Sequence, residues 1–184
     1  MSVSHPESAN DVPQDAHHAA MAWLDSRGVP YVVLKHPKTF AALDEAVASG
    51  VDPRETLKTL VLSDRGQHIL AVVPASHHLD IGRARAALQA SPDLRLASES
   101  EIAEEFPAFE LGAIPPFGPM LPAPEVVDVR ILYRERVLCS GGDHVHSLAI
   151  DPRDLIRVTE PRVADICAHR HPSHEHDFES LPHL

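Results

Sequence analysis

The sequence predicts an α+β fold in which helices flank a mixed, mostly antiparallel β-sheet. Two features of the apolar pattern carry this prediction. Some segments repeat apolar residues at helical spacing, whereas others form short strand-like runs that meet in hairpins without regular strand–helix alternation. In addition, a chain of 184 residues with 43% hydrophobic content is long enough to bury a core of its own.

The N-terminal part of the chain predicts a leader, a helix and a strand. Residues 1–14 are polar and show no apolar pattern, so we expect a disordered leader. Asp15 then caps a helix with one apolar face, and this helix ends at Gly28. The run VPYVVLKH at 29–36 predicts a strand.

The next segment predicts a short helix followed by a hairpin. The helix in TFAALDEAVASG begins near Thr39 and ends at Gly50. Its residues expected to face inward are Leu43, Ala46 and Val47. Residues 58–74 hold two apolar runs around the polar stretch SDRGQ, which is the pattern of a β-hairpin.

Caps mark the starts of three further helices. Asp80 stands at the N-cap position of a helix at 79–90. Ser98 and Glu101 form a capping box that opens a helix at 98–106. A third helix at 151–159 has Asp151 as its cap and Pro152 at its first position.

The other expected elements lie in the C-terminal half. They are strands at 125–132, 136–142 and 146–151 and a final helical piece at 161–170. No repeat or linker divides residues 15–170, which therefore predict a single domain, whereas 171–184 predict a His-rich flexible tail. The sheet is expected to be curved and barrel-like, as the family resemblance described below implies.

Charge and composition exclude several classes of protein. A net charge of −11 argues against a long basic footprint on nucleic acid, although a few local contacts with one end of a nucleic acid remain compatible with it. The sequence has no membrane-spanning run and no signal peptide. Cys139 and Cys167 form neither a CxxC pair nor a disulfide framework, so we expect reduced thiols in a cytoplasmic protein.

Few standard catalytic motifs are present. The chain lacks a GxSxG elbow, a P-loop, a GxGxxG and an HExxH motif. The tail HRHPSHEHDF is the nearest candidate for metal binding, but nothing in its pattern holds the histidines in a ligand geometry, so we expect no metal site and no cofactor.

The turn SGGDHVHS at 140–147 allows two interpretations. Ser140, Asp143, His144 and His146 bring together the residue types of a hydrolytic site, but triad members normally come from separate segments. The alternative is a hairpin turn with solvated histidines. Lys58, one of three lysines, is similarly open: it is a solvated strand end, or it places an ammonium over a pocket for a phosphate or an oxyanion.

The loop LGAIPPFGPMLP at 111–122 combines two glycines and four prolines with apolar residues. Proline removes a backbone donor and restricts φ, so the loop cannot be a helix and would make a poor central strand. It is either a rigid crossover between elements or a preformed wall of a binding site.

Five segments in order resemble the YbaK/EbsC family of freestanding aminoacyl-tRNA deacylases, which is related to the editing insertion domain of bacterial prolyl-tRNA synthetase. They are ETLKTLVL, AVVPASHHLDIGRARAAL, LGAIPPFG, LCSGGD and DLIRVTEPRVADI. The resemblance runs from about residue 17 to 170. It implies hydrolysis of the ester that joins a wrong amino acid to the 3′ end of a tRNA.

The resemblance also implies roles for individual residues. Lys58 matches the functional lysine of the family and is the catalytic candidate, orienting the terminal adenosine phosphate or stabilising charge. The expected substrate-binding residues are Gly112, Ala113, Ile114, Pro115, Pro116, Phe117, Gly118, Ser140, Gly141, Gly142 and Asp143. Ser147 departs from members that place an aspartate there, which leaves the amino acid open.

These matches lead to a mechanism without a protein nucleophile. Backbone N–H groups of the proline-rich loop would bind the ester carbonyl, Ile114 and Phe117 would wall a small pocket, and water would attack with help from the substrate. The partners expected are a mischarged tRNA carrying a small amino acid and an aminoacyl-tRNA synthetase, with no membrane. The alternatives are an inactive tRNA or synthetase adaptor, and a metal-binding regulator that acts through the tail.

Overall fold

The computed structural model describes residues 16–169. The predicted leader at 1–14, the cap at Asp15 and the tail at 171–184 therefore lie outside the described residues.

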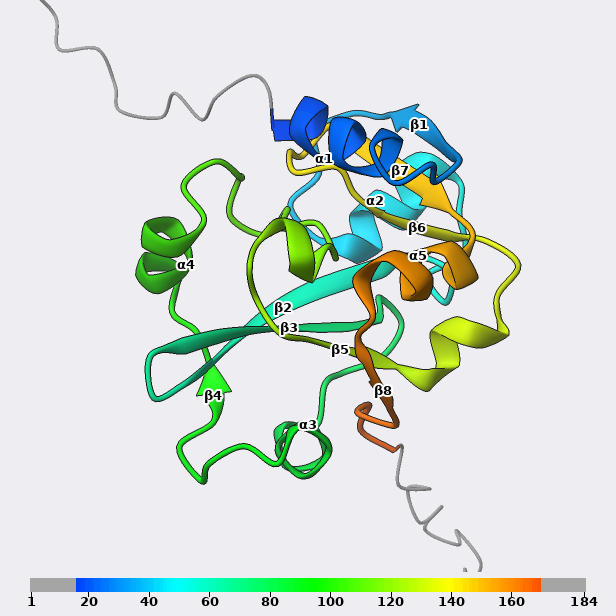
Figure 1. Ribbon diagram of the computed structural model, residues 1–184. Coiled ribbons are helices and arrows are strands. Elements are labelled where there is room, and N and C mark those ends of the chain that lie inside the picture. Colours follow the sequence, from blue (N-terminus) through cyan, green and yellow to red (C-terminus); the bar gives the residue numbers. More distant parts are fainter. Residues whose placement is uncertain (1–15, 170–184) are drawn as a thin grey trace, which may run out of the picture.

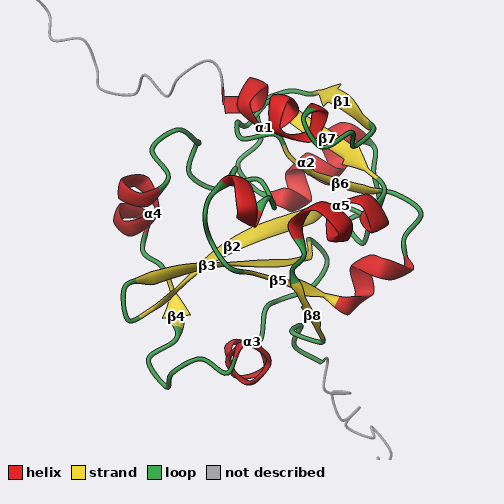
Figure 2. Ribbon diagram, viewed as in Figure 1, coloured by secondary structure: helices red, strands yellow, loops and turns green. Residues whose placement is uncertain are grey.

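Two β-sheets form the centre of the structure and confirm the α+β class (Figures 1 and 2). The antiparallel sheet has the order β1–β7–β6, with strands β1 (Tyr31–Lys35), β6 (Val137–Ser140) and β7 (His146–Ile150). The mixed sheet has the order β4–β2–β3–β5–β8, with β2 (Leu57–Asp64), β3 (Gln67–Pro74), β4 (Arg95–Leu96), β5 (Glu125–Asp128) and β8 (Arg162–Ala164).

A backbone bridge joins the two sheets. Thr56 and Leu138 form a parallel bridge, and the N–H of Leu138 donates to the carbonyl of Glu55 at 2.8 Å. This junction brings the start of β2 beside β6. Within the described part of the chain the sheets do not close into the barrel-like sheet that was expected.

Local sequence explains the best-defined elements. The β2–β3 hairpin turns through Arg65 and Gly66, which both have positive φ. The two-residue turn that matches the twist of the strands requires positive φ at both of its central residues. The predicted caps at Asp80, Ser98 and Asp151 all accept hydrogen bonds from backbone N–H groups. The helices are α1 (Ala16–Asp25), α2 (Ala42–Ser49), α3 (Ile81–Leu88), α4 (Glu99–Glu105) and α5 (Pro152–Thr159), and the 3₁₀ turns are η1 (Gly118–Met120) and η2 (Val129–Tyr133).

The core lies on both faces of the mixed sheet. On one face, the sheet packs towards α1, α5 and the antiparallel sheet through residues such as Leu57, Val72 and Leu148. The other face packs on α3 through Ala84 and the segment that contains Ile166. Figure 1 shows α3 on the side of the mixed sheet away from β1, β6 and β7.

Three element predictions were wrong in part. The segment 161–170 is not helical: after Glu160 adopts a left-handed conformation, residues 162–164 add as strand β8 in parallel to β5. The strand expected at 125–132 ends at Asp128, where that side chain caps the 3₁₀ turn η2 through the N–H of Arg130.

The third correction concerns the face that α2 buries. Leu43 and Val47 are exposed, whereas Glu45 and Ala46 face inward, because the helix packs one position further round than its apolar residues suggest. The buried face of α2 therefore carries the carboxylate of Glu45, where the sequence predicted Leu43.

No helix in the described range is long and apolar enough to cross a membrane.

Candidate functional site

A narrow pocket lies at the start of α2. Its lining comes from the segment between His36 and Glu45, from Gly112 and Ala113, and from the turn between Ser140 and His144. The pocket is narrow, and short side chains and backbone make up much of its wall.

A hydroxyl ties the proline-rich loop to the glycine turn. Ser140 Oγ donates to the carbonyl of Ala113 at 2.8 Å and accepts from the N–H of Gly142 at 3.1 Å. In addition, the N–H of Glu110 donates to the carbonyl of Gly142 at 3.2 Å. The structure therefore brings these two predicted segments together, as two walls of the pocket.

Glycine is required at one position of this turn for two reasons. Gly142 has a φ of +112°, which L residues rarely adopt, and a Cβ there would lie 2.8 Å from the ring of Phe109. Gly141 is also close-packed, since a Cβ would lie 3.0 Å from the carbonyl oxygen of His146.

The far end of the proline-rich loop is held by a buried carboxyl. Glu125 at the start of β5 accepts from the N–H of Gly118 at 2.7 Å. Burial raises the pKa of Glu125 to about 8, although the hydrogen bond from the Gly118 N–H and the nearby Thr159 hydroxyl oppose the shift. The loop is therefore pinned at Ala113 and again at Gly118.

The bulky residues of the loop lie in the core. Phe117 is fully buried and stacks on Trp23 at a ring-centroid distance of 5.2 Å, and Ile114 packs in a separate apolar cluster. Neither lines the pocket, although the sequence predicted them as its wall. At this loop the pocket surface is formed by Gly112 and Ala113.

Backbone donors surround the pocket mouth. No side chain caps α2, and both Ala41 at its N-cap and Ala42 at its first position line the pocket. The first N–H groups of the helix therefore have no side-chain cap among the described residues, and they lie at the positive end of the helix dipole. The N–H of Gly112 also donates to no described residue.

Asp143 closes the glycine turn and binds it to α1. Its carboxylate accepts from the N–H groups of Val145 and His146, and it contacts Nδ1 of His146 at 2.8 Å and Nδ1 of His17 at 3.0 Å. Burial alone would raise the pKa of Asp143, but these hydrogen bonds outweigh it and the pKa is lowered.

The two histidines and Asp143 lie close enough together to share a metal ion. However, the rings of His17 and His146 are stacked with centroids 3.9 Å apart, and the Nδ1 atoms of both lie within 3.0 Å of one oxygen of Asp143. The carboxylate already contacts both rings. These contacts fix the glycine turn against α1.

Lys58 lies on β2, on the opposite face of the strand from Leu57. Its cross-strand partner is Val73, and both belong to the face that packs on α3, whereas Leu57 faces the side of Phe117. No described residue forms a hydrogen bond or ion pair with Lys58. Burial lowers the pKa of its ammonium, and a weaker interaction with Cys167 opposes that shift.

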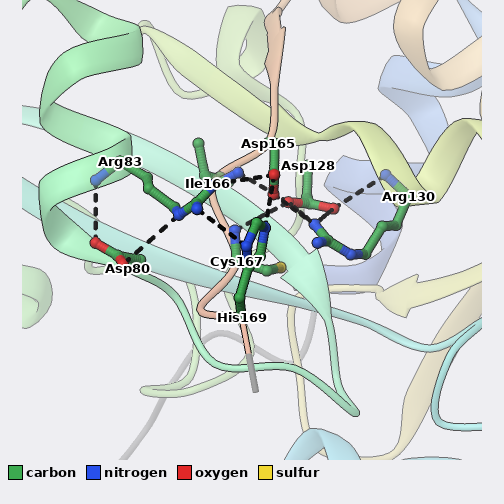
Figure 3. Close-up of polar contacts among 8 residues, drawn as sticks. All are labelled: Asp80, Arg83, Asp128, Arg130, Asp165, Ile166, Cys167 and His169. Atoms are coloured by element: carbon green, nitrogen blue, oxygen red, sulfur yellow. Dashed lines mark hydrogen bonds and ion pairs between the residues drawn. The ribbon is translucent and has the colours of Figure 1, made fainter. Parts of the chain in front are cut away.

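The segment beside Lys58 is fixed by an ion-pair network (Figure 3). The buried carboxylate of Asp128 accepts from the N–H groups of Ile166 and Cys167 at 2.9 and 3.1 Å. Arg130 joins Asp128 to Asp165 at 3.0 and 2.7 Å. Lys58 itself is not among the residues that line the pocket.

Comparison with known proteins decides the family. The model of the aminoacyl-tRNA editing domain family matches residues 36–158, about two thirds of the chain, including all pocket segments. The chain belongs to this family. The predicted resemblance is confirmed, and membership implies an interaction of this editing domain with tRNA.

Solved structures agree with this assignment. The editing domain is similar to the crystal structure of hypothetical protein APE2540, with 28% identity, a TM-score of 0.74 and coverage of 82% of this chain and 99% of that one. It is also similar to a proposed trans-editing enzyme for prolyl tRNA synthetase, with 27% identity, a TM-score of 0.74 and coverage of 84% and 98%.

Neither Ser140 nor the two cysteines has the surroundings of an activated nucleophile. The proton of the Ser140 hydroxyl is engaged by the Ala113 carbonyl, and no imidazole is hydrogen-bonded to that hydroxyl. Cys139 is fully buried, and burial raises the pKa of its thiol well above the usual value. Burial likewise raises the pKa of Cys167 to about 12.

Sequence reasoning missed the polar residues at the pocket floor. Glu45 lines the pocket from α2, His36 follows β1, and both contact the hydroxyl of Ser147 on β7. One signal was present in the sequence: Glu45 shares a helical stripe with Ala42 and Ala46. His36 stands in no motif, and Ser147 was noted only as a departure from family members that place an aspartate there.

Proposed function

We propose that this editing domain is a trans-acting deacylase that hydrolyses the ester between a small amino acid and the 3′ end of a mischarged tRNA. The observation that carries the proposal is the pairing of a narrow pocket with open backbone donors, from the start of α2 and from Gly112, in a chain of the editing family. Donors held in place before the reaction stabilise the oxyanion that forms when water attacks an ester.

The pocket size supports selection of small side chains. The wall consists of short side chains and backbone at Ala42, Gly112 and Ala113, and little free space remains. A closed wall rejects oversized side chains sterically, whereas it discriminates weakly, by about 1–3 kcal/mol per methylene, against smaller ones.

The surface beside the pocket supports binding of a nucleotide end. The ring of Phe40 is 71% exposed, lies 4.9 Å from the His144 ring between centroids, and has the ammonium of Lys38 at 5.3 Å. An exposed aromatic ring with a neighbouring cation suits stacking of a terminal base. Few such contacts are needed, which fits the net charge of −11.

Lys58 belongs to the proposal as a contact for a tRNA phosphate. Its half-buried, unpaired ammonium is a suitable partner for an anion. A synthetase partner and a cytoplasmic location complete the proposal.

The test is a panel of aminoacyl-tRNAs charged with alanine, serine, cysteine or phenylalanine, with release of the amino acid as the measurement. We expect cleavage of one or more of the three small esters and none of the phenylalanyl ester. Binding of the tRNAs without cleavage of any would identify the adaptor instead, and fast phenylalanine release would contradict the size filter.

A pair of variants on α2 links the activity to this pocket. Ala42→Leu fills the pocket and should reduce cleavage at least about tenfold. Ala48→Leu places the same side chain on the exposed face of the same helix and should leave cleavage unchanged. Equal activity of the two variants would place the reaction elsewhere.

A further inference from the structure

Three polar side chains at the pocket floor form one hydrogen-bonded chain. Nε2 of His36 lies 2.8 Å from Oγ of Ser147, and that hydroxyl also contacts Oε1 of Glu45. Nδ1 of His36 lies 2.8 Å from the carbonyl oxygen of Pro37. This hydrogen-bonded chain therefore links Glu45 on α2, which lines the pocket, to Ser147 on β7 and then to His36, the residue after β1.

Counting protons shows that this chain holds one mobile proton. The carbonyl of Pro37 only accepts, so Nδ1 of His36 carries a proton and donates it. The hydroxyl of Ser147 can donate its single proton to only one of its two partners, Glu45 and Nε2 of His36. The partner that does not receive this proton must donate one to the Ser147 oxygen. The chain is either a carboxylic acid with a neutral imidazole or a carboxylate with an imidazolium.

Glu45 connects this chain to the pocket. Ser147 engages only Oε1, and Glu45 itself lines the pocket, so Oε2 has no hydrogen-bond partner among the described residues. Burial raises the pKa of Glu45, while the hydrogen bond from Ser147 and the nearby His36 lower it by less. Such a carboxyl exchanges a proton nearer to neutral pH than a solvated one does.

Other titratable groups near Glu45 are few. The thiol of Cys139 on β6 lies close enough to interact with the carboxylate and stays protonated, because its pKa is raised. Asp143 and His144 line the pocket from the glycine turn, and Asp44 on α2 itself is exposed.

We propose that Glu45, Ser147 and His36 form a proton relay in which Glu45 takes a proton from the attacking water and returns it to the leaving oxygen. This inference rests on the proposed deacylase function. Glu45 is the catalytic residue, and Ser147 and His36 are positioning residues that act through it.

The step balances without any further reactant. As the water oxygen bonds to the ester carbonyl carbon, its proton moves to the Glu45 carboxylate, and the positive charge gained by the relay offsets the new oxyanion. The bond from that carbon to the ribose 3′ oxygen then breaks, and the same proton moves from Glu45 to the 3′ oxygen. The products are the amino acid and the tRNA hydroxyl.

The experiment measures single-turnover deacylation against pH, on the best substrate of the panel above, for the unmodified chain and three variants. Glu45→Gln keeps a hydrogen bond to Ser147 but cannot accept the proton, so we expect the rate to fall about 10²–10⁴-fold. Asp44→Asn, the neighbouring exposed carboxylate on α2, is the matched control and should stay within threefold of the unmodified chain. Thermal unfolding confirms that each variant folds.

Ser147→Ala separates a relay from a structural role. Losing the hydroxyl removes a bond that lowers the pKa of Glu45, so the acid limb of the pH–rate profile should move to higher pH, together with a rate loss of about tenfold. A variant that only loosened the fold would lower the rate at every pH without moving this limb.

The outcomes distinguish the relay from the function on which it rests. If the unmodified chain cleaves its substrate and Glu45→Gln does so equally well, the relay is wrong and the deacylase stands. An unmoved acid limb in Ser147→Ala also overturns the relay. If no panel member is cleaved by the unmodified chain, the proposed function fails and the relay fails with it.

Discussion

Glu45 and Lys58 are both partly buried ionisable residues, but they differ in whether another side chain is bonded to them. Both are partly buried, but Glu45 has a hydrogen-bonded partner in Ser147, whereas Lys58 has none among the described residues. A buried charge without a partner reduces stability unless it serves a ligand. We therefore expect Lys58 to bind an anion, whereas Glu45 is expected to act in the pocket.

Replacing Lys58 by methionine should affect binding and stability in opposite directions. The melting temperature should rise by a few degrees, because a desolvated ammonium is replaced by an apolar chain of similar length. The KM for aminoacyl-tRNA should increase about tenfold with kcat within threefold, as expected for one lost charge-assisted contact. Steady-state kinetics and thermal unfolding measure the two effects.

Lys35→Met is the control for this prediction. Lys35 is exposed on β1, and its loss should change neither KM nor melting temperature appreciably. A fall in kcat with unchanged KM in Lys58→Met would show instead that Lys58 acts in the chemical step.

At the scale of elements, the glycine turn between β6 and β7 depends on a specific backbone conformation. Gly142→Ala should lower the free energy of unfolding by about 1–3 kcal/mol and abolish deacylation, because the residue has positive φ and its Cβ would collide with Phe109. Denaturant unfolding and single-turnover rates measure these losses.

The β2–β3 hairpin supplies the control for Gly142. Gly66 also has positive φ, but a Cβ there would meet nothing within 4 Å. Gly66→Ala should therefore lower stability by only about 1 kcal/mol and leave the rate unchanged. Equal losses in the two variants would mean that backbone strain alone, without the contact at Phe109, explains the effect.

Elements with their own local signals were predictable. Caps at Asp80 and Ser98 and the polar turn of the hairpin specify structure through neighbouring residues, and all three predictions are confirmed. Strand β8 was not predictable, because its three residues become a strand only by pairing with β5. The inward face of α2 was missed because Leu43 and Val47 are apolar yet exposed.

At the scale of the whole molecule, one buried carboxyl links stability to pH. Glu125 has a pKa of about 8 in the folded state and 4.5 as its ordinary value, so the folded state binds more protons between these values. The free energy of unfolding should therefore fall as pH rises from about 4.5 to 8, by up to about 5 kcal/mol from this group. Denaturant titrations across this range measure the slope.

Glu125→Gln should remove this contribution. An amide can still accept from the Gly118 N–H and carries no charge at high pH, so the variant should be more stable than the unmodified chain above pH 8. Glu104→Gln, at an exposed carboxylate on α4, should leave the slope unchanged. An unaltered slope in Glu125→Gln would show that another group carries the pH dependence.

The candidate site was predictable only where residues adjacent in sequence form it. The proline-rich loop and the glycine turn are short segments, and the structure places both at the pocket, joined by Ser140. The floor was not predictable, because His36 and Ser147 are 111 positions apart and meet only through the fold. Their signal lies in strand pairing, which a single sequence does not display.

The pairing of β1 with β7 has a consequence for the order of folding. Residues 31–35 find their partners at 146–150, so most of the chain must be made before this sheet can close. Contacts so distant in sequence form late, since the entropy of closing the loop opposes them until other contacts are in place. On the ribosome, a nascent chain would therefore complete the β2–β3 hairpin early and gain its pocket floor only near the end of synthesis.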